Sequence, residues 1–390
     1  MRFRNYNLFV IWNLCFVIFY FMFKKIFIFD WVLVASVLFL SGISLLALYG
    51  ISAAGFKEQG IIWKQLVYVI LGIAAMIFFA RVDYHYLRSY SRPIYFITIL
   101  FLIAVLFLGS TSHGTSGWLN FGFFNVQPIE FAKIALIIFL ASFISSKKMV
   151  LGEMVRLFAS VVLTIVIIFL VIKQPDLGGA MILLAIWLGM LLLSGINKKT
   201  FFIIFSVGIL LSAASWFFLA DYQKARIANF VNPQLDIKGS GYNVFQSIIA
   251  VGSGGITGKG IGQGSQSQLN FLPESHNDFI FATITEELGF FGSMLILFLY
   301  AIILYRLKNI ASLAPDNFGY LVICGIMIML FFQLLVNIGM NMGLAPVVGV
   351  TLPFLSYGGS SILVCFIAIG IALNVYNKRT ISDSKVVQSY

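Results

Sequence analysis

Long runs of apolar residues alternate with short polar segments along most of this 390-residue chain. A run of about 20 apolar residues is long enough to cross roughly 30 Å of hydrocarbon as a helix. We place ten such helices at residues 31–51, 61–80, 93–109, 130–146, 155–172, 177–195, 200–220, 279–305, 318–339 and 360–376. The pattern therefore predicts an all-α polytopic membrane protein of about ten transmembrane helices.

Lysine and arginine collect on one side of these predicted helices. That side holds 15 of the 25 basic residues: Lys24, Lys25, Arg81, Arg88, Arg92, Lys147, Lys148, Arg156, Lys198, Lys199, Arg306, Lys308, Lys378, Arg379 and Lys385. Basic residues of membrane proteins collect in cytoplasmic loops. We therefore expect that side, with both ends of the ten-helix unit, to be cytoplasmic. The same rule accounts for the net charge of +11 without a nucleic-acid partner.

Composition supports this assignment. The chain is 61% hydrophobic and only 10% charged, which excludes an ordinary soluble domain. Cys15, Cys324 and Cys365 all lie inside apolar runs, so they read as small buried hydrophobic residues rather than as disulfides or zinc ligands.

Three segments stand apart from the helical core. Residues 1–25 form an apolar extension that suits an eleventh span, a segment at the membrane surface or a signal-like region, and Met22 is an alternative start. Residues 26–380 are expected to form a single transmembrane domain, followed by a short cytoplasmic tail at 381–390. The outer loop 221–278, between the seventh and eighth helices, is too long for a mere connection, which suggests a function.

The end of this loop holds Glu274, His276 and Asp278 within five residues. A carboxylate near apolar helices loses solvation free energy, so each one is expected to have a task. Asp278 precedes a long apolar run and suits a helix cap. It also suits a general base, because partial desolvation raises the pKa of a carboxyl group. One histidine with two acids is more typical of a loose divalent-cation site than of zinc.

A second polar motif opens the predicted helix at 130–146. Pro128 and Glu130 suit a helix start. Lys133 does not, because a cation near a helix N-terminus opposes the helix dipole, and it would suit an anion such as diphosphate. Asp176 repeats the plan at the next outer helix start, with Lys173 nearby.

The segment 252–264 is rich in glycine and contains Lys259. It departs from the nucleotide-binding P-loop, since Ser253 stands at the first glycine position and Gly260 follows the lysine. Two interpretations remain open: a flexible turn, or a nest of backbone N–H groups with Lys259 facing a lipid-linked diphosphate.

Other polar residues carry alternatives of their own. Glu286 and Glu287 lie near the predicted interface and are expected to form an ion pair with Lys133, Lys173 or Arg226. Arg226 itself suits either the membrane surface or a phosphate. The segments 337–346 and 352–361 contain proline and small residues and predict a broken helix or re-entrant turn, which transporters also use.

Taken together, several of these segments match the motifs of one protein family. They are Gln127-Pro-Ile-Glu-Phe-Ala-Lys133, Gln174-Pro-Asp-Leu-Gly178, Arg226-Ile, Asn232-Pro, Gly241-Tyr, Gln246-Ser247, Gly252-Ser-Gly-Gly, Leu272-Pro-Glu-Ser-His-Asn-Asp-Phe-Ile-Phe281, Glu286-Glu-Leu-Gly289 and Leu352-Pro-Phe-Leu-Ser-Tyr-Gly-Gly-Ser-Ser361. On these motifs, residues 26–380 resemble the SEDS family (shape, elongation, division and sporulation). The stretch 264–273 looks more like the elongation member RodA than the division member FtsW.

The resemblance implies a peptidoglycan glycosyltransferase in the bacterial cytoplasmic membrane. Such an enzyme polymerises lipid II, an undecaprenyl-diphosphate-linked disaccharide peptide, on the outer face. It works with a class B penicillin-binding transpeptidase and membrane proteins of the elongation complex. The resemblance places the catalytic aspartate at Asp278. For the reaction itself we expect Mg²⁺ or Mn²⁺ as a cofactor that helps to neutralise the diphosphate, with Asp278 as a candidate ligand, and no nucleotide.

We assign further residues to two groups. Expected substrate or diphosphate contacts are Lys133, Arg226, Lys259, Glu130, Gln246, Ser247, Ser356 and Ser360. Expected supporting residues are Glu274, His276, Asp176 and Glu286. The chain departs from the family pattern at Gly117, where arginine is usual, and at Ile129, Asn243 and Asn277. The missing arginine weakens an anion-binding role for the loop 110–129.

Three other functions compete with this prediction. A carrier that flips lipid II would use broken helices and cationic grooves equally well, but it should place ionisable residues near the bilayer centre. A scaffold that only activates a transpeptidase would not depend on Asp278. A division or sporulation member of the family would share the chemistry. The acids and motif loops cluster on the outer side, which favours chemistry outside the membrane.

Overall fold

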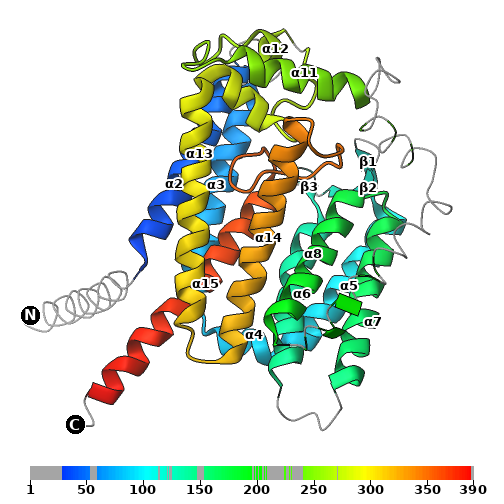
Figure 1. Cartoon of the computed structure of the whole chain (residues 1–390), viewed down its shortest axis with the longest axis vertical. Helices are drawn as coiled ribbons and strands as arrows, with labels where there is room; N and C mark the ends of the chain where they lie inside the picture. The colour runs from blue at the N-terminus through cyan, green and yellow to red at the C-terminus, as the bar shows by residue number, and fades with distance from the viewer. Residues whose placement is uncertain are drawn as a thin grey trace, which may run out of the picture.

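The computed structural model describes residues 29–52, 59–112, 115–120, 122, 125–146, 153–195, 240–269 and 271–387, with isolated positions between 197 and 230. Long helices run roughly side by side and form a bundle (Figure 1). Within the described residues, eight helices are long and apolar enough to cross a membrane. They are α2 (Trp31–Ser52), α3 (Gln59–Arg81), α5 (Ser91–Leu108), α6 (Pro128–Ser145), α7 (Glu153–Ile172), α13 (Ile280–Ser312), α14 (Asn317–Asn341) and α15 (Gly359–Val387).

A ninth apolar helix, α8 (Leu177–Leu193), is shorter. These nine helices match nine of the ten predicted spans, so the protein is confirmed as a polytopic all-α membrane protein. The predicted span at 200–220 falls where only isolated positions are described, and it stays a prediction. The extension 1–25 lies outside the described residues.

Three of the helices form the centre of the bundle. Most residues of α6, α14 and α15 are buried, whereas α3, α5 and α7 leave many apolar side chains exposed. Glycine allows α15 and α3 to approach closely: a Cβ atom at Gly370 would lie 2.5 Å from the carbonyl oxygen of Met76. Small residues permit such contacts between membrane helices.

The end of the bundle where α13 begins is called the outer end here, and the opposite end the inner end. Two short helices, α11 (Ser240–Ser253) and α12 (Ser265–Gln268), lie across the outer end. A small antiparallel sheet of β1 (Ser110–Ser112), β2 (Thr115–Asn120) and β3 (Asn125–Val126) forms most of the loop between α5 and α6. Residues 342–358, between α14 and α15, are not helical, as predicted for a re-entrant segment.

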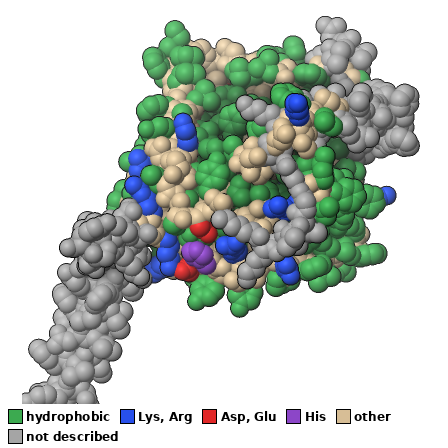
Figure 2. Space-filling view, turned by 60° about the horizontal axis from the view of Figure 1, so that its bottom comes forward, with side chains coloured by type: hydrophobic (Ala, Val, Ile, Leu, Met, Phe, Trp, Pro, Cys, Tyr) green, Lys and Arg blue, Asp and Glu red, His purple; other side chains and the backbone are tan. Residues whose placement is uncertain are grey.

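Ion pairs at the inner end join segments far apart in the sequence. Asp83 precedes the short helix α4 (Tyr84–Ser89) and pairs with Lys378 and His85. Asp316 caps α14 and lies 4.0 Å from Arg88. Burial alone would raise the pKa of Asp83, but hydrogen bonds from Lys378 and His85 lower it to about 2. Figure 2 looks onto this end, where Lys and Arg side chains gather, in agreement with the predicted cytoplasmic side.

Candidate functional site

The segment before α13 folds as a series of turns. Glu274 has a positive φ of 56°, which a non-glycine residue rarely adopts. Its carbonyl oxygen accepts hydrogen bonds from the backbone N–H groups of Asn277 and Phe279. Its carboxylate accepts one from Asn277 Nδ2 at 2.6 Å. Glu274 therefore shapes the turn that presents Asp278.

Two buried amides of α14 hold the backbone of Asp278. Asn337 Nδ2 and Asn341 Nδ2 each donate to the carbonyl oxygen of Asp278 at 3.0 Å. Asn341 Oδ1 accepts from the N–H of Ala282 at 3.1 Å, and Asn337 Nδ2 also donates to the carbonyl of Val350 at 2.7 Å. We call Asn337 and Asn341 the asparagine clamp. It joins the start of α13, the end of α14 and the re-entrant segment.

Asp278 is not the N-cap residue of α13, so its predicted role as a helix cap is wrong. Helix α13 begins at Ile280, with Phe279 at the N-cap position and no side-chain cap bond. Asn341 satisfies the Ala282 N–H that a cap would otherwise serve. The Asp278 side chain is half-buried, and a Cβ atom at Gly349 would lie 3.6 Å from its Oδ2. Its carboxyl group therefore lies against the re-entrant segment.

Serines predicted to contact substrate make bonds within the protein. Ser356 Oγ donates to the carbonyl of Asn277 at 2.7 Å. Ser360 Oγ accepts from the N–H of Gln127 at 3.0 Å. Ser247 Oγ donates to the carbonyl of Asn341 at 2.8 Å. Hydrogen bonds from these hydroxyl groups hold the backbone in place around Asp278 and at the start of α6.

The two predicted outer helix starts pack beside the same segment. Pro128 occupies the first turn of α6, as predicted. Lys133 Nζ lies 2.7 Å from Glu130 Oε1, and both side chains are buried. Asp176 caps α8 by accepting from the N–H of Gly179 at 2.7 Å. A Cβ atom at Gly178 would lie 2.4 Å from the carbonyl oxygen of Val348, so α8 meets the re-entrant segment next to Gly349.

Glu286 forms the predicted ion pair, but with a different partner. Of the three predicted partners, Arg226 lies outside the described residues, and Lys133 pairs with Glu130. Instead Lys259 Nζ lies 2.7 Å from Glu286 Oε1.

The fully buried Glu286 carboxylate also accepts from the N–H groups of Gln266 at 3.0 Å and Ser267 at 3.4 Å. Backbone N–H groups after the glycine-rich segment thus bind the protein's own carboxylate. Sequence reasoning missed this because the lysine and the carboxylate are 27 residues apart.

The glycines of residues 252–264 permit close packing on a break in α13. Helix α13 is interrupted at Gly289, where φ is 64° and ψ is −158°. The N–H groups of Lys259 and Gly260 donate to the carbonyls of Glu286 and Glu287, both at 3.0 Å. A Cβ atom at Gly258 would lie 2.1 Å from the carbonyl oxygen of Glu287. The segment therefore replaces hydrogen bonds that the broken helix cannot make.

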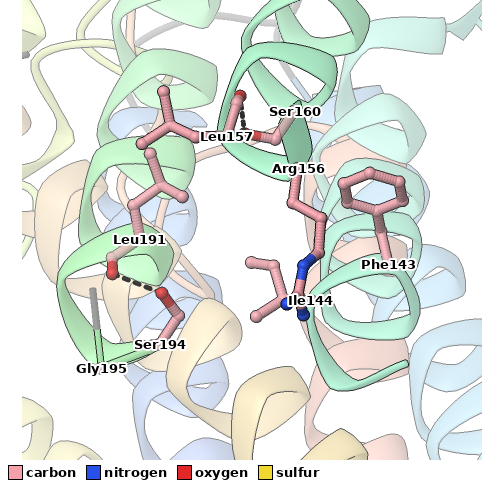
Figure 3. A pocket seen from close by; sticks show the side chains of 8 residues that line it. All are labelled: Phe143, Ile144, Arg156, Leu157, Ser160, Leu191, Ser194 and Gly195. Carbon is pink, nitrogen blue, oxygen red and sulfur yellow. Dashed lines mark hydrogen bonds between the residues drawn. The ribbon is translucent and has the colours of Figure 1, made fainter. Parts of the chain in front are cut away.

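Two apolar cavities lie among the membrane helices and reach the outer end at β3 and the start of α6. The larger, of about 430 Å³, is lined from α3, α4, α5, α6 and α15. The second, of about 390 Å³, includes Tyr68, Asn125 and Ser360 at the outer end. Val126 and Phe131 line both cavities, so together they form one apolar groove. A third cavity lies at the inner ends of α6, α7 and α8 and contains Arg156 (Figure 3), with no lining residue from the Asp278 segment.

Two predicted site residues remain outside this arrangement. Arg226 lies outside the described residues. Gln246 lies on α11 and is half-buried. Across the described parts of the chain, no three His, Cys, Asp or Glu side chains gather closely enough to hold a metal by themselves. A cation at Asp278 stays a prediction.

Comparison with known proteins gives a consistent result. The family model for FtsW, RodA and SpoVE, described as "Cell cycle protein", matches residues 15–381. The chain is 39% identical to stage V sporulation protein E of Bacillus subtilis over 89% of this chain and 96% of that protein. It is 37% identical to peptidoglycan glycosyltransferase MrdB of Escherichia coli, over 86% and 90% of the two chains.

Solved structures share the fold over most of this chain. A chain from a structure titled as a peptidoglycan synthase complex that coordinates polymerization and crosslinking aligns with a TM-score of 0.77 and 28% identity, covering 90% of this chain and 98% of that one. The rod shape determining protein RodA of Thermus thermophilus aligns with a TM-score of 0.68 and 26% identity, covering 90% and 97%.

Proposed function

This chain belongs to the FtsW, RodA and SpoVE family of cell cycle proteins, and we propose that it is a peptidoglycan glycosyltransferase that polymerises lipid II at the outer face of the bacterial cytoplasmic membrane. The observation that carries the proposal is the placement of Asp278. Its half-buried carboxyl lies at the outer end of the bundle, and two buried amides fix its backbone. A relative 37% identical over 86% of this chain bears the name peptidoglycan glycosyltransferase.

The reaction requires one base and one stabilised leaving group. An acceptor hydroxyl attacks the anomeric carbon of the donor sugar, and Asp278 takes its proton as the new carbon–oxygen bond forms. The bond from that carbon to the lipid diphosphate breaks, and the diphosphate leaves with the electron pair. A positioned base contributes on the order of 10²–10⁴ in rate. Cleavage of the donor's bond between the sugar and the diphosphate supplies the driving force, so no nucleotide is required.

The leaving diphosphate requires cationic neighbours. We assign this role to Arg226 and Lys133. The ion pair of Lys133 with Glu130 holds the ammonium group in place near the start of α6. Lys259 is bound to the fully buried Glu286, which favours a structural role for that lysine.

The apolar groove is evidence for a lipid-linked substrate. Its two cavities have few polar lining residues, as an isoprenoid chain requires. The groove reaches Ser360, which is bonded to the N–H before α6. A tail in the groove would therefore place its diphosphate near the outer helix starts.

The partner and the cellular process are further parts of the proposal. A class B penicillin-binding transpeptidase is the expected partner, since a similar chain comes from a peptidoglycan synthase complex that coordinates polymerization and crosslinking. A role in cell elongation rests on the sequence of 264–273. Relatives named for sporulation, MrdB and FtsW are all 35–39% identical, so identity does not choose among these roles.

Reconstitution with lipid II separates the candidate activities. The purified protein is placed in vesicles with labelled lipid II, with and without the transpeptidase, and glycan strands and lipid II translocation are both measured. The proposal predicts strands that require Asp278. Translocation without strands would support a carrier instead. Increased crosslinking by the transpeptidase without strands from this chain would support a scaffold.

A further inference from the structure

Three aromatic rings from three different elements meet beside the Asp278 segment. The ring centroids of His276 and Tyr357 are 5.7 Å apart, and those of Tyr68 and Tyr357 are 6.4 Å apart. Tyr68 belongs to α3, His276 to the turn before α13, and Tyr357 to the turn before α15. We call these three residues the aromatic row.

Buried hydrogen bonds fix the middle ring. The N–H of Tyr357 donates to the carbonyl of His276 at 2.9 Å. On its other side, the fully buried Gln65 donates from Nε2 to the carbonyl of Ser356 at 3.3 Å and accepts from the N–H of Gly358 at 3.4 Å. The backbone on both sides of Tyr357 is therefore held before any ligand binds, which reduces the entropy cost of binding.

The row connects the groove with the carboxyl group. Tyr68 lines the outer cavity of about 390 Å³. Glycine at 359 lets its ring pack against the start of α15, where a Cβ atom would lie 2.6 Å from the ring. At the other end of the row, His276 is two residues before Asp278. The row therefore runs from the groove to the turn that carries Asp278.

The exposure of the rings distinguishes the row from core packing. Tyr84, Tyr95 and Tyr300 of this protein are 1–2% exposed, whereas Tyr68 and Tyr357 remain half-buried. An aromatic ring carries a negative face, and the C–H face of a sugar ring packs favourably on it. The Tyr357 hydroxyl adds a hydrogen-bonding group that suits a sugar hydroxyl.

We propose that Tyr68, Tyr357 and His276 form a saccharide subsite that binds the sugar of the lipid-linked substrate between the groove and Asp278. This inference rests on the proposed function for the identity of the substrate. It assigns sugar recognition to the aromatic row, separately from the lipid tail and the diphosphate.

Binding measured in an Asp278→Asn background tests the subsite without turnover. The ligands are lipid II and undecaprenyl diphosphate, which shares the tail and diphosphate but lacks the sugars. Tyr357→Leu is expected to weaken lipid II binding about tenfold and to leave undecaprenyl diphosphate binding unchanged. Tyr357→Phe, which keeps the ring, is expected to recover most of the lost affinity. Tyr49→Leu, at an exposed tyrosine of α2, is the matched control.

The outcomes separate this inference from the proposed function. Equal losses for both ligands would show that Tyr357 only packs the turn, and would overturn the subsite. Unchanged lipid II binding in Tyr357→Leu would overturn it as well. If Asp278→Asn itself still polymerises lipid II, the catalytic assignment fails, while the two-ligand comparison still judges the aromatic row.

Discussion

Replacing Asn341 by leucine tests whether the asparagine clamp positions Asp278. Leucine has a similar size but removes a donor to the Asp278 carbonyl and the acceptor of the Ala282 N–H. The Asp278 carbonyl keeps its bond from Asn337, so the main orphan is the N–H of Ala282. A buried unsatisfied group costs about 1–3 kcal/mol. We therefore expect the free energy of unfolding to fall by about that amount, with the fold intact.

Activity should fall by more than stability explains. A misplacement of about 1 Å at a reacting group can cost about 10²-fold in rate. We expect kcat for lipid II polymerisation by Asn341→Leu to fall by roughly that factor, with little change in KM, because the clamp does not contact the groove.

Gln333→Leu is the matched control for this variant. Gln333 is a buried amide one helical turn from Asn337, and no bond joins it to Asp278 among the described residues. Its variant should keep both stability and kcat. Thermal unfolding in detergent and steady-state polymerisation are measured on the same preparations. If Asn341→Leu is destabilised but retains wild-type kcat per folded molecule, the clamp is only structural.

Three further predictions address the packing, the inner end and the groove. Gly258→Ala places a Cβ 2.1 Å from a carbonyl oxygen, whereas Gly252→Ala meets nothing within 4 Å. Gly258→Ala should lower the free energy of unfolding by about 1–3 kcal/mol and Gly252→Ala by less than about 0.5 kcal/mol, as measured by denaturant or thermal unfolding. Equal effects of the two variants would contradict the close packing of Gly258 against α13. The pKa of Asp83 is lowered to about 2 in the folded protein from 3.8, so the stabilisation by its carboxylate is complete above about pH 4 and is lost as the pH falls through about 2. Asp83→Asn should lower the free energy of unfolding by under about 1 kcal/mol at neutral pH. A difference in the free energy of unfolding from the parent protein that grows toward pH 2 would refute this. Ala135→Phe fills the larger apolar cavity and should raise KM for lipid II about tenfold with kcat retained, unlike Val162→Phe on the exposed face of α7; matching KM values would argue against the groove.

The helices and the Asp278 segment were predictable because each depends on a local signal. A span requires only a long enough apolar run, and nine runs became apolar helices. The cluster of Glu274, His276 and Asp278 stood out because charge is scarce elsewhere. Pro128 correctly marked the start of α6.

The supports of the site were not predictable because each joins distant segments. Asn341 bonds to Asp278, 63 residues away. Its spacing of four from Asn337 puts both amides on one helix face, a signal that indicates a polar contact but not its partner. Lys259 and Glu286 also required the tertiary fold. The glycines of residues 252–264, which the sequence suggested form a flexible turn, instead permit close packing against the broken helix α13.

We propose that Asp278 takes the proton of the attacking sugar hydroxyl. The most direct measurement is the single-turnover rate of lipid II polymerisation by Asp278→Asn, which keeps the size and the backbone bonds of the residue but removes the base. We expect the rate to fall by about 10²–10⁴ while lipid II binding is retained. A rate within a few-fold of the unaltered protein would contradict it.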